Sequence, residues 1–171
     1  MIREIVVYPD KRLRKVSRDV ESFDTDLHKL LDDMYETMIA KKGIGLAAIQ
    51  VGIEKNVLII NLSDEEGNQH KEDLLEVVNP KITHLEGSEI YQEGCLSVPG
   101  YYDDVKRAQN ISVEYFDRFG TLVKDELEGL LAIAIQHEMD HLKGHLFIEK
   151  LSYLKRKKFE KEWKKKLKAG K

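Results

Sequence analysis

The sequence contains only one cysteine, three prolines and one tryptophan, and it has no long apolar run. The single cysteine, Cys95, excludes a disulfide within the chain, which is typical of proteins that work in a reducing compartment. The apolar run at the start is too short for a secretory signal peptide, and no later stretch approaches the roughly 20 apolar residues of a membrane span. We therefore expect a cytoplasmic protein without a membrane partner, or the mature form of an organellar one.

Charge is unevenly distributed along the 171 residues. Residues 151–171 contain ten Lys or Arg against two Asp or Glu, a local charge of +8. Residues 1–150 contain 18 basic and 29 acidic groups, a charge of −11. A chain of this length usually forms one domain, so we expect the basic segment to pack on the acidic body. Such a segment favours a polyanionic partner, although a merely solvated basic face is an equal alternative.

Hydrophobic periodicity predicts sequential strands with helices set apart from them. The expected elements are a helix over 25–42 that ends at Gly43 and Gly45, strands over 57–61 and 75–79 with the second closed by Pro80, a less regular continuation over 82–90, a hairpin over 111–123, and helices over about 127–142 and 152–168. This order predicts an α+β fold. Its antiparallel or mixed sheets are expected to pack around the 127–142 helix, with an N-terminal helix and a basic C-terminal helix.

Two of these helices carry informative apolar patterns. Residues 130–135 are apolar on all sides, which predicts a buried helix and a rigid support. In the last helix an apolar stripe is expected to face the body, and it consists of Leu151, Leu154, Phe159, Trp163 and Leu167.

His137, Glu138 and His141 form the pattern His-Glu-x-x-His within the 127–142 helix. Residues four apart lie on one helix face, so both imidazoles can hold one metal ion. Glu138 lies close enough to handle a proton of water at that ion. The pattern therefore predicts a metal-dependent hydrolase.

A catalytic metal site usually has three protein ligands, so one more is needed. The other four histidines are expected to be solvated or structural, and they are His28, His70, His84 and His145. Cys95 is the better candidate, because Gly94 and Pro99 bound it in a segment unsuited to a regular strand or helix. A lone cysteine is most often a small core residue, but a thiolate is also a strong ligand for iron or zinc.

Three motifs now stand in order along the chain: Gly43-Ile-Gly-Leu-Ala-Ala-Ile-Gln-Val-Gly52, Glu93-Gly-Cys-Leu-Ser97 and Gln136-His-Glu-Met-Asp-His141. Together they resemble the three motifs of the peptide deformylase family. The resemblance covers roughly residues 1–150, and the basic segment 151–171 is a more variable extension. It implies an enzyme of the bacterial cytoplasm that removes the formyl group from the N-terminal methionine of nascent polypeptides.

The resemblance also implies roles for individual residues. Cys95, His137 and His141 would hold one divalent metal, natively Fe²⁺, with Zn²⁺, Ni²⁺ or Co²⁺ as substitutes. Glu138 would be the acid and base, while Gln50 and the backbone N–H of Leu96 would form an oxyanion hole.

A peptide substrate is expected to lie extended beside residues 44–46, with the methionine side chain in an apolar pocket. The expected substrate contacts are Ile44, Gly45, Tyr91, Glu93, Gly94, Ile133 and Ala134. Core packing is an equally good explanation of Ile133. Tyr102 stands where many deformylases have an arginine beside the substrate, so that role does not carry over. We expect Arg107 to be structural and to pair with Asp140.

Three further expectations concern the whole protein. The basic helix could dock on the ribosome through rRNA phosphates, and the chain is expected to be a monomer. One alternative is a metalloprotease that uses a downstream ligand such as Glu149. The other is a non-enzymatic RNA-binding module with a structural metal, which a fourth protein ligand would favour.

Overall fold

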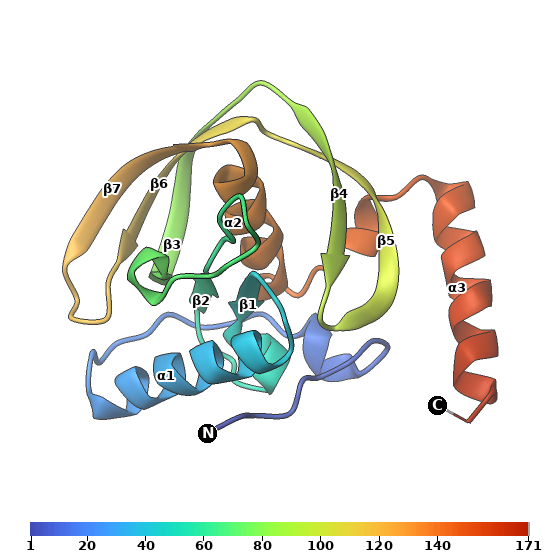
Figure 1. Cartoon of the computed structure of the whole chain (residues 1–171), viewed down its shortest axis with the longest axis horizontal. Coiled ribbons are helices and arrows are strands. Elements are labelled where there is room, and N and C mark those ends of the chain that lie inside the picture. Colours follow the sequence, from blue (N-terminus) through green and yellow to red (C-terminus); the bar gives the residue numbers. More distant parts are fainter. Residues whose placement is uncertain (171) are drawn as a thin grey trace.

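The computed structural model describes residues 1–170, which form an α+β fold, as expected (Figure 1). The helices of this part of the chain are α1 (Thr25–Ala40), α2 (Gly129–Leu142) and α3 (Tyr153–Lys168), with 3-10 turns η1 (Lys11–Arg14), η2 (Ala48–Val51), η3 (Lys71–Asp73) and η4 (Phe147–Lys150). The strands are β1 (Gly45–Ala47), β2 (Val57–Ile60), β3 (Leu75–Glu86), β4 (Glu89–Cys95), β5 (Val98–Arg107), β6 (Asn110–Phe116) and β7 (Leu122–Glu128). None of the helices described is long and apolar enough to cross a membrane.

The strands form two antiparallel sheets with α2 between them (Figure 1). One sheet has the order β1-β2-β3-β6-β7, so β1 is an edge strand. The other consists of β4 and β5 alone, and a sheet of two strands needs packing partners to be stable. The central helix supplies a shared surface for both sheets.

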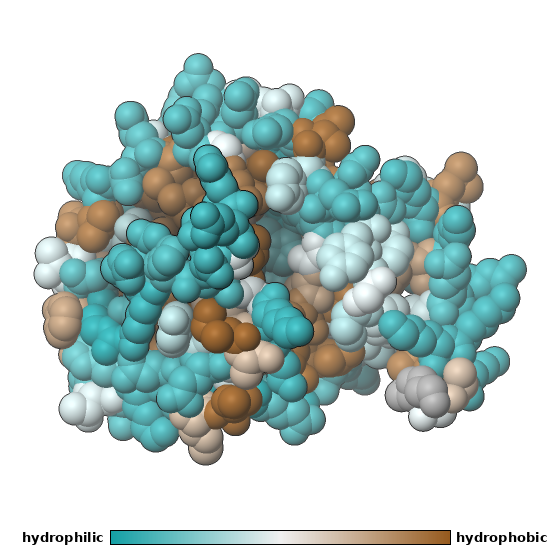
Figure 2. Space-filling model, viewed as in Figure 1, coloured by the Kyte–Doolittle hydropathy of each residue, from teal (hydrophilic) through white to brown (hydrophobic). Residues whose placement is uncertain are grey.

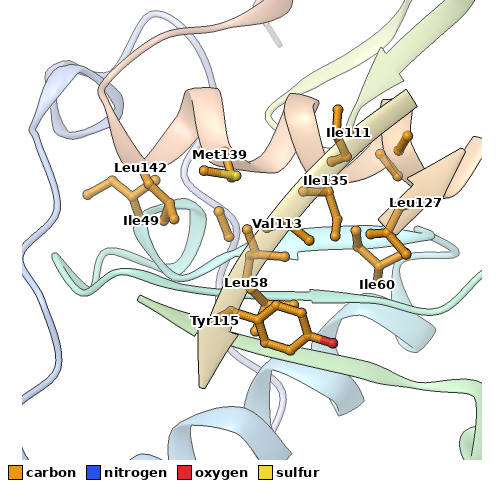
Figure 3. Close-up of a cluster of buried hydrophobic side chains, with 14 residues drawn as sticks. Ile49, Leu58, Ile60, Ile111, Val113, Tyr115, Leu127, Ile135, Met139 and Leu142 are labelled. Atoms are coloured by element: carbon orange, nitrogen blue, oxygen red, sulfur yellow. The ribbon is translucent and has the colours of Figure 1, made fainter. Parts of the chain in front are cut away.

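Strand β2 shows why the core has two halves. Leu58 and Ile60 face the cluster that α2 joins, and Figure 3 shows Leu58 near Val113 and Ile60 near Leu127. Val57 and Ile59 point the other way and pack with the apolar face of α1. All four residues of the strand are therefore buried, and each such side chain contributes roughly 1.5–3 kcal/mol of transfer free energy.

Pro80 does not close a strand, which corrects the expectation from the sequence. Strand β3 continues to Glu86, with a register shift against β6 between Val78 and Lys81. Asn79 takes a left-handed φ of 52° at this bulge. Its side chain donates to the carbonyl of Val20 and accepts from the same residue's N–H, so polar groups at the irregularity are paired. A bulge accommodates proline because its nitrogen need not donate to the ladder.

The segment around Cys95 is also more regular than expected. Cys95 ends β4 and pairs with Val98 of β5, so these two strands form a long hairpin with a tight turn. A Cβ on Gly94 would lie 2.3 Å from the ring carbon Cε1 of Tyr102, so any larger residue there would displace this ring from its observed position. The expected continuation over 82–90 is divided by Gly87, whose φ is +69°, into the end of β3 and the start of β4.

Helix α2 begins at Gly129, two residues later than expected, because Leu127 and Glu128 pair with β6. The apolar stripe of α3 is only partly buried. Phe159 and Trp163 are buried with Leu151, but Leu154 is 80% exposed and Leu167 is 43% exposed. The reason is geometric: α3 stands at the side of the molecule, so only the side chains that face the body are covered (Figure 1). Lys171, the last residue of the basic segment, lies outside the described residues.

Candidate metal centre and active site

Cys95, His137 and His141 bring one ligand atom each to within 4.8 Å of one another. The Cys95 Sγ lies 3.3 Å from the His141 Nε2. The sulfur comes from the end of β4, and both imidazoles come from successive turns of α2. Among residues 1–170 this is the cluster of His, Cys, Asp and Glu that could hold a metal ion.

A buried ion-pair network orients the first of these imidazoles. The Nδ1 atom of His137 lies 2.8 Å from the Glu93 carboxylate, which leaves Nε2 for the cluster. Arg107 Nη2 donates to Glu93 over 2.9 Å, and Arg107 Nη1 donates to Asp140 over 2.9 Å. Arg107 is only 6% exposed, so its expected structural pairing with Asp140 is confirmed. A carboxylate behind a ligating histidine holds the ring and raises its basicity.

This donor set fits a divalent transition metal. One thiolate and two imidazoles suit zinc or ferrous iron, and three protein ligands leave one coordination position for water or substrate. Although burial opposes it, the charge of Glu138 with Cys95 and Glu93 holds the pKa of His137 well above its ordinary value. Burial, together with the charges of His137 and Arg107, lowers the pKa of His141 well below its ordinary value, which favours the neutral, ligating imidazole.

Glu138 lies beside this cluster and directly follows His137 in the chain. Burial raises the pKa of Glu138 to about 7 against the opposing charge of His137. Its Oε1 atom is buried and has no hydrogen-bond partner within the described part of the chain. Gly45 of β1 passes directly against it, because a Cβ on Gly45 would lie 2.5 Å from the Glu138 Oε2. The close approach explains why this position is a glycine.

Both the oxygen and the nitrogen of the Gln50 side-chain amide have hydrogen-bond partners. Its Oε1 accepts from the Ala47 N–H over 2.9 Å, while Nε2 lies 3.1 Å from Ser97 Oγ and 3.4 Å from Cys95 Sγ. Leu96 is the residue between Cys95 and Ser97 in the turn that joins β4 and β5. The two residues expected to supply an oxyanion hole therefore flank the thiol.

A pocket of about 600 Å³ opens over this site. Every residue expected to contact substrate lines it, namely Ile44, Gly45, Tyr91, Glu93, Gly94, Ile133 and Ala134. The carboxylate of Glu93, however, is engaged by Arg107 and His137 rather than presented to the pocket. Tyr102 also lines the pocket and is 64% exposed.

Some residues of the site were not recognised from the sequence. Ser97 is fully buried and accepts from Gln50 Nε2, and Glu93, expected as a substrate contact, also pairs with His137, which the sequence did not indicate. A sequence signal for Glu93 is its place two residues before Cys95 in the same expected segment, since residues two apart on a strand tend to share one face. Lys41, Lys42 and Leu130 also line the pocket without having been expected there.

Glu149 does not act as a third ligand of a protease-like site. Its carboxylate accepts from the Leu146 N–H over 2.7 Å and bonds to Arg14 and His145, so it stabilises η4. The other histidines have separate surroundings, as expected; His28, for instance, lies 2.8 Å from the carbonyl of Arg118.

The chain matches the family model described as polypeptide deformylase over residues 2–157. A peptide deformylase from Nautilia profundicola is 58% identical over 167 residues, which cover 98% of this chain and 96% of that protein. One from Helicobacter pylori strain P12 is 60% identical over 161 residues, covering 94% and 92%.

Solved structures agree with these relatives. The crystal structure of a peptide deformylase from Legionella pneumophila has a TM-score of 0.88 and 43% identity, and the match covers 100% of this chain and 99% of that one. A structure from Acinetobacter baumannii with Met-Ala-Ser bound has a TM-score of 0.82 and 30% identity, covering 88% and 99%. Because the family model spans most of the chain and these relatives match nearly their whole lengths, the chain belongs to the polypeptide deformylase family of enzymes.

Proposed function

We propose that this protein is a metal-dependent hydrolase that removes the formyl group from the N-terminal formyl-methionine of newly made polypeptides and releases formate. The observation that carries the proposal is the convergence of Cys95, His137 and His141 beside Glu138 at the base of the pocket. The donor set supports one divalent ion, with Fe²⁺ proposed natively and Zn²⁺, Ni²⁺ or Co²⁺ as substitutes. When bound, such an ion supplies Lewis acidity toward water and the formyl carbonyl.

Glu138 is suited to move the proton. Burial raises its pKa, which makes the carboxylate a better proton acceptor for the attacking water and lets it return the proton to the departing amine. Its burial among Gly45 and His137 keeps the carboxylate aimed at the reacting atoms.

Gln50 and Leu96 would stabilise the developing negative charge. The amide of Gln50 is already fixed by Ala47 and Ser97, so little reorganisation is needed when the oxyanion forms. The backbone N–H of Leu96 is the second donor. Loss of one such donor typically lowers kcat by about 10²–10³.

The edge strand β1 offers a surface for the peptide. Its free edge can pair with an extended main chain, which is largely independent of side-chain sequence and suits a substrate class as broad as nascent chains. Ile133 and Ala134 on α2, with Ile44 and Tyr91, provide apolar walls for the methionine side chain. The Met-Ala-Ser bound to the A. baumannii relative supports a peptide that begins with methionine.

The test measures formate release from formyl-Met-Ala-Ser and acetate release from acetyl-Met-Ala-Ser by anaerobically purified ferrous protein. We expect formate from the formyl peptide and no acetate from the acetyl peptide, because the extra methyl group of the acetyl peptide would not fit beside the buried Glu138. Glu138→Gln is the matched control and should retain metal while losing nearly all activity. Cleavage of internal peptide bonds, or no formate from wild type that carries a full equivalent of metal, would contradict the proposal.

The basic helix is part of the same proposal, as a ribosome-docking element of a monomeric protein in the bacterial cytoplasm. Phe159 and Trp163 are buried against the body, and the Trp163 Nε1 donates to the Tyr8 carbonyl, which supports a single domain. Figure 2 shows mainly hydrophilic side chains over the outer surface of α3. Lys155 and Lys166 already bond to Asp103 and the Pro99 carbonyl, so docking would rely on the other basic residues.

Salt-dependent co-sedimentation with ribosomes tests this docking. Charge reversal at exposed lysines of α3, such as Lys157→Glu with Lys161→Glu, preserves the buried contacts that deletion of the helix would remove. We expect binding at low salt to fall in this variant and the salt dependence to weaken. Unchanged co-sedimentation would exclude docking through α3.

A further inference from the structure

Two exposed lysines, Lys41 and Lys42, line the mouth of the pocket where α1 ends. The two carboxylates that also line the pocket belong to Glu93 and Glu138, and each residue is only 5% exposed. Arg107 already neutralises Glu93. Within residues 1–170 neither lysine forms a salt bridge, so the mouth is locally cationic on a body that carries a charge of −11.

The backbone holds these two lysines in place. The N–H of Lys41 donates to the Thr37 carbonyl, and the N–H of Lys42 donates to Ile39. The next N–H, of Gly43, donates back to Met38 over 2.9 Å, which completes a helix-ending turn. The backbone of both lysines is therefore fixed by hydrogen bonds to the last turn of α1.

Lys42 occupies a conformation that its side chain disfavours. Its φ is +60°, in the left-handed region where glycine or asparagine usually ends a helix. A lysine here costs free energy that a glycine would not, and such costs concentrate at functional sites. The strained φ of Lys42 and its position at the pocket mouth are independent observations. Both indicate that the positive charge of this side chain has a function in the site.

The two lysines lie where the peptide would leave the site. Gly45 contacts Glu138, so the formylated end of a substrate paired with β1 lies near Gly45. Lys42 precedes Gly45 by three residues, so the Cα atoms of these two residues lie at most about 11 Å apart. Side chains of the first few residues after methionine can therefore come near Lys41 and Lys42.

We propose that this enzyme prefers formyl-methionyl peptides that carry Asp or Glu among the first few residues after methionine, and that Lys41 and Lys42 supply the preference. The inference rests on the proposed deformylase function and narrows its substrate class. Exposed charge pairs are individually weak, so we expect roughly a two- to fivefold gain in kcat/KM from each lysine at low salt. The gain should shrink with added salt, because the screening length falls from about 10 Å at 0.1 M to about 3 Å at 1 M.

The experiment compares formyl-Met-Ala-Glu-Ser, formyl-Met-Ala-Gln-Ser and formyl-Met-Ala-Lys-Ser at low and high salt, with protein of equal metal content. Wild type should favour the Glu peptide over the Gln peptide by about tenfold at low salt, mainly through KM, and the Lys peptide should be poorer still. The double variant Lys41→Glu with Lys42→Glu should reverse this order. Lys55→Glu with Lys81→Glu makes the same change in net charge outside the pocket and should keep the wild-type order.

The possible failures are distinguishable. If wild type releases formate from all three peptides with equal kcat/KM, the inference is wrong while the proposed function stands. If the control pair changes the order as much as the Lys41 and Lys42 pair, the protein's overall charge sets the preference and the assignment to these lysines is wrong. If metal-loaded wild type releases no formate at all, the proposed function fails and this inference fails with it.

Discussion

Gly45 has no side chain, and this absence leaves room for the carboxylate of Glu138. Its φ lies outside the left-handed region, so the requirement for glycine comes from the neighbouring Glu138 and not from the backbone. An added methyl group would meet Oε2 at 2.5 Å and the carboxyl carbon at 3.2 Å. Because Glu138 is itself buried, its carboxylate has little room in which to move.

We predict that Gly45→Ala lowers kcat by about 10²-fold, because a displacement of about 1 Å in a catalytic group has effects of this size. Metal content should stay close to wild type, since the ligands are not altered, and the melting temperature should fall by only a few degrees, because overpacking by one methyl group costs about 1–3 kcal/mol. Steady-state kinetics, metal analysis and calorimetry on the same preparation check this. A wild-type kcat would show that Glu138 does not need its observed position.

Arg107 is the second residue whose environment sets a clear expectation. Removal of one partner from a buried ion pair leaves the other charge without compensation, which costs about 3–5 kcal/mol. We therefore predict that Arg107→Met lowers the free energy of unfolding by about 3 kcal/mol or more in urea denaturation. Lys106→Met changes the exposed neighbour on the same strand and should have little effect.

The double variant Arg107→Met with Glu93→Gln separates charge from packing. It removes the uncompensated carboxylate, so it should recover part of the lost stability. If the double variant is no more stable than Arg107→Met alone, packing of the guanidinium rather than its charge is what holds this part of the core.

At the scale of elements, η4 depends on one carboxylate. Burial by itself would raise the pKa of Glu149, but the Leu146 N–H, His145 and Arg14 together hold it below its ordinary value. A depressed pKa in the folded state contributes stability that is fully present above the unfolded value of about 4.3. That contribution is lost as pH falls through the lower, folded value.

We predict that Glu149→Gln lowers the free energy of unfolding by about 1 kcal/mol at pH 7, a modest value because Arg14 is 43% exposed at its side chain. The difference between wild type and variant should shrink as pH falls from 5 to 3. Denaturant titrations at four pH values measure it, with the exposed Glu126→Gln as control. A difference that stays constant down to pH 3 would exclude a role for the ionised carboxylate.

On the scale of the whole molecule, the proposed metal site adds a further link between the β4–β5 sheet and α2, which already meet through the Glu93–His137 and Arg107–Asp140 pairs. Cys95 belongs to the β4–β5 sheet, whereas His137 and His141 belong to the helix that covers the five-stranded sheet. A bound ion would therefore link the two sheets through α2. Ligands that bind only the folded state stabilise it by about 4 kcal/mol at 1,000 times their dissociation constant.

We predict that chelation of metal lowers the melting temperature by about 10 °C, since 1 kcal/mol corresponds to roughly 2–4 °C for a protein of this size. Calorimetry with Ni²⁺ or Zn²⁺ and with EDTA measures the difference. Cys95→Ser should lose most of the metal-dependent shift because a thiolate ligand is gone. Identical melting curves with metal and with EDTA would count against a metal held by these three residues.

Much of the site could be predicted from the sequence because its signals are local. Helix periodicity alone places His137 and His141 on one face with Glu138 beside them, and the structure has them on α2. The α+β class and most helices and strands also follow from short-range apolar spacing. The prediction that Pro80 ends a strand was wrong, because a bulge accommodates the proline within β3. The prediction that the segment around Cys95 is irregular was also wrong, because β4 and β5 meet there in a tight hairpin turn.

What the sequence alone determined is therefore the identity of the chemical groups and their order along local elements. Only the tertiary structure decided that Glu93 faces an imidazole, that Gly45 lies against Glu138, and that lysines after α1 border the pocket. These relations join segments about 45 to 90 residues apart in the chain. They depend on how strands pair and on which side of a sheet a helix packs, and no local periodicity contains that information.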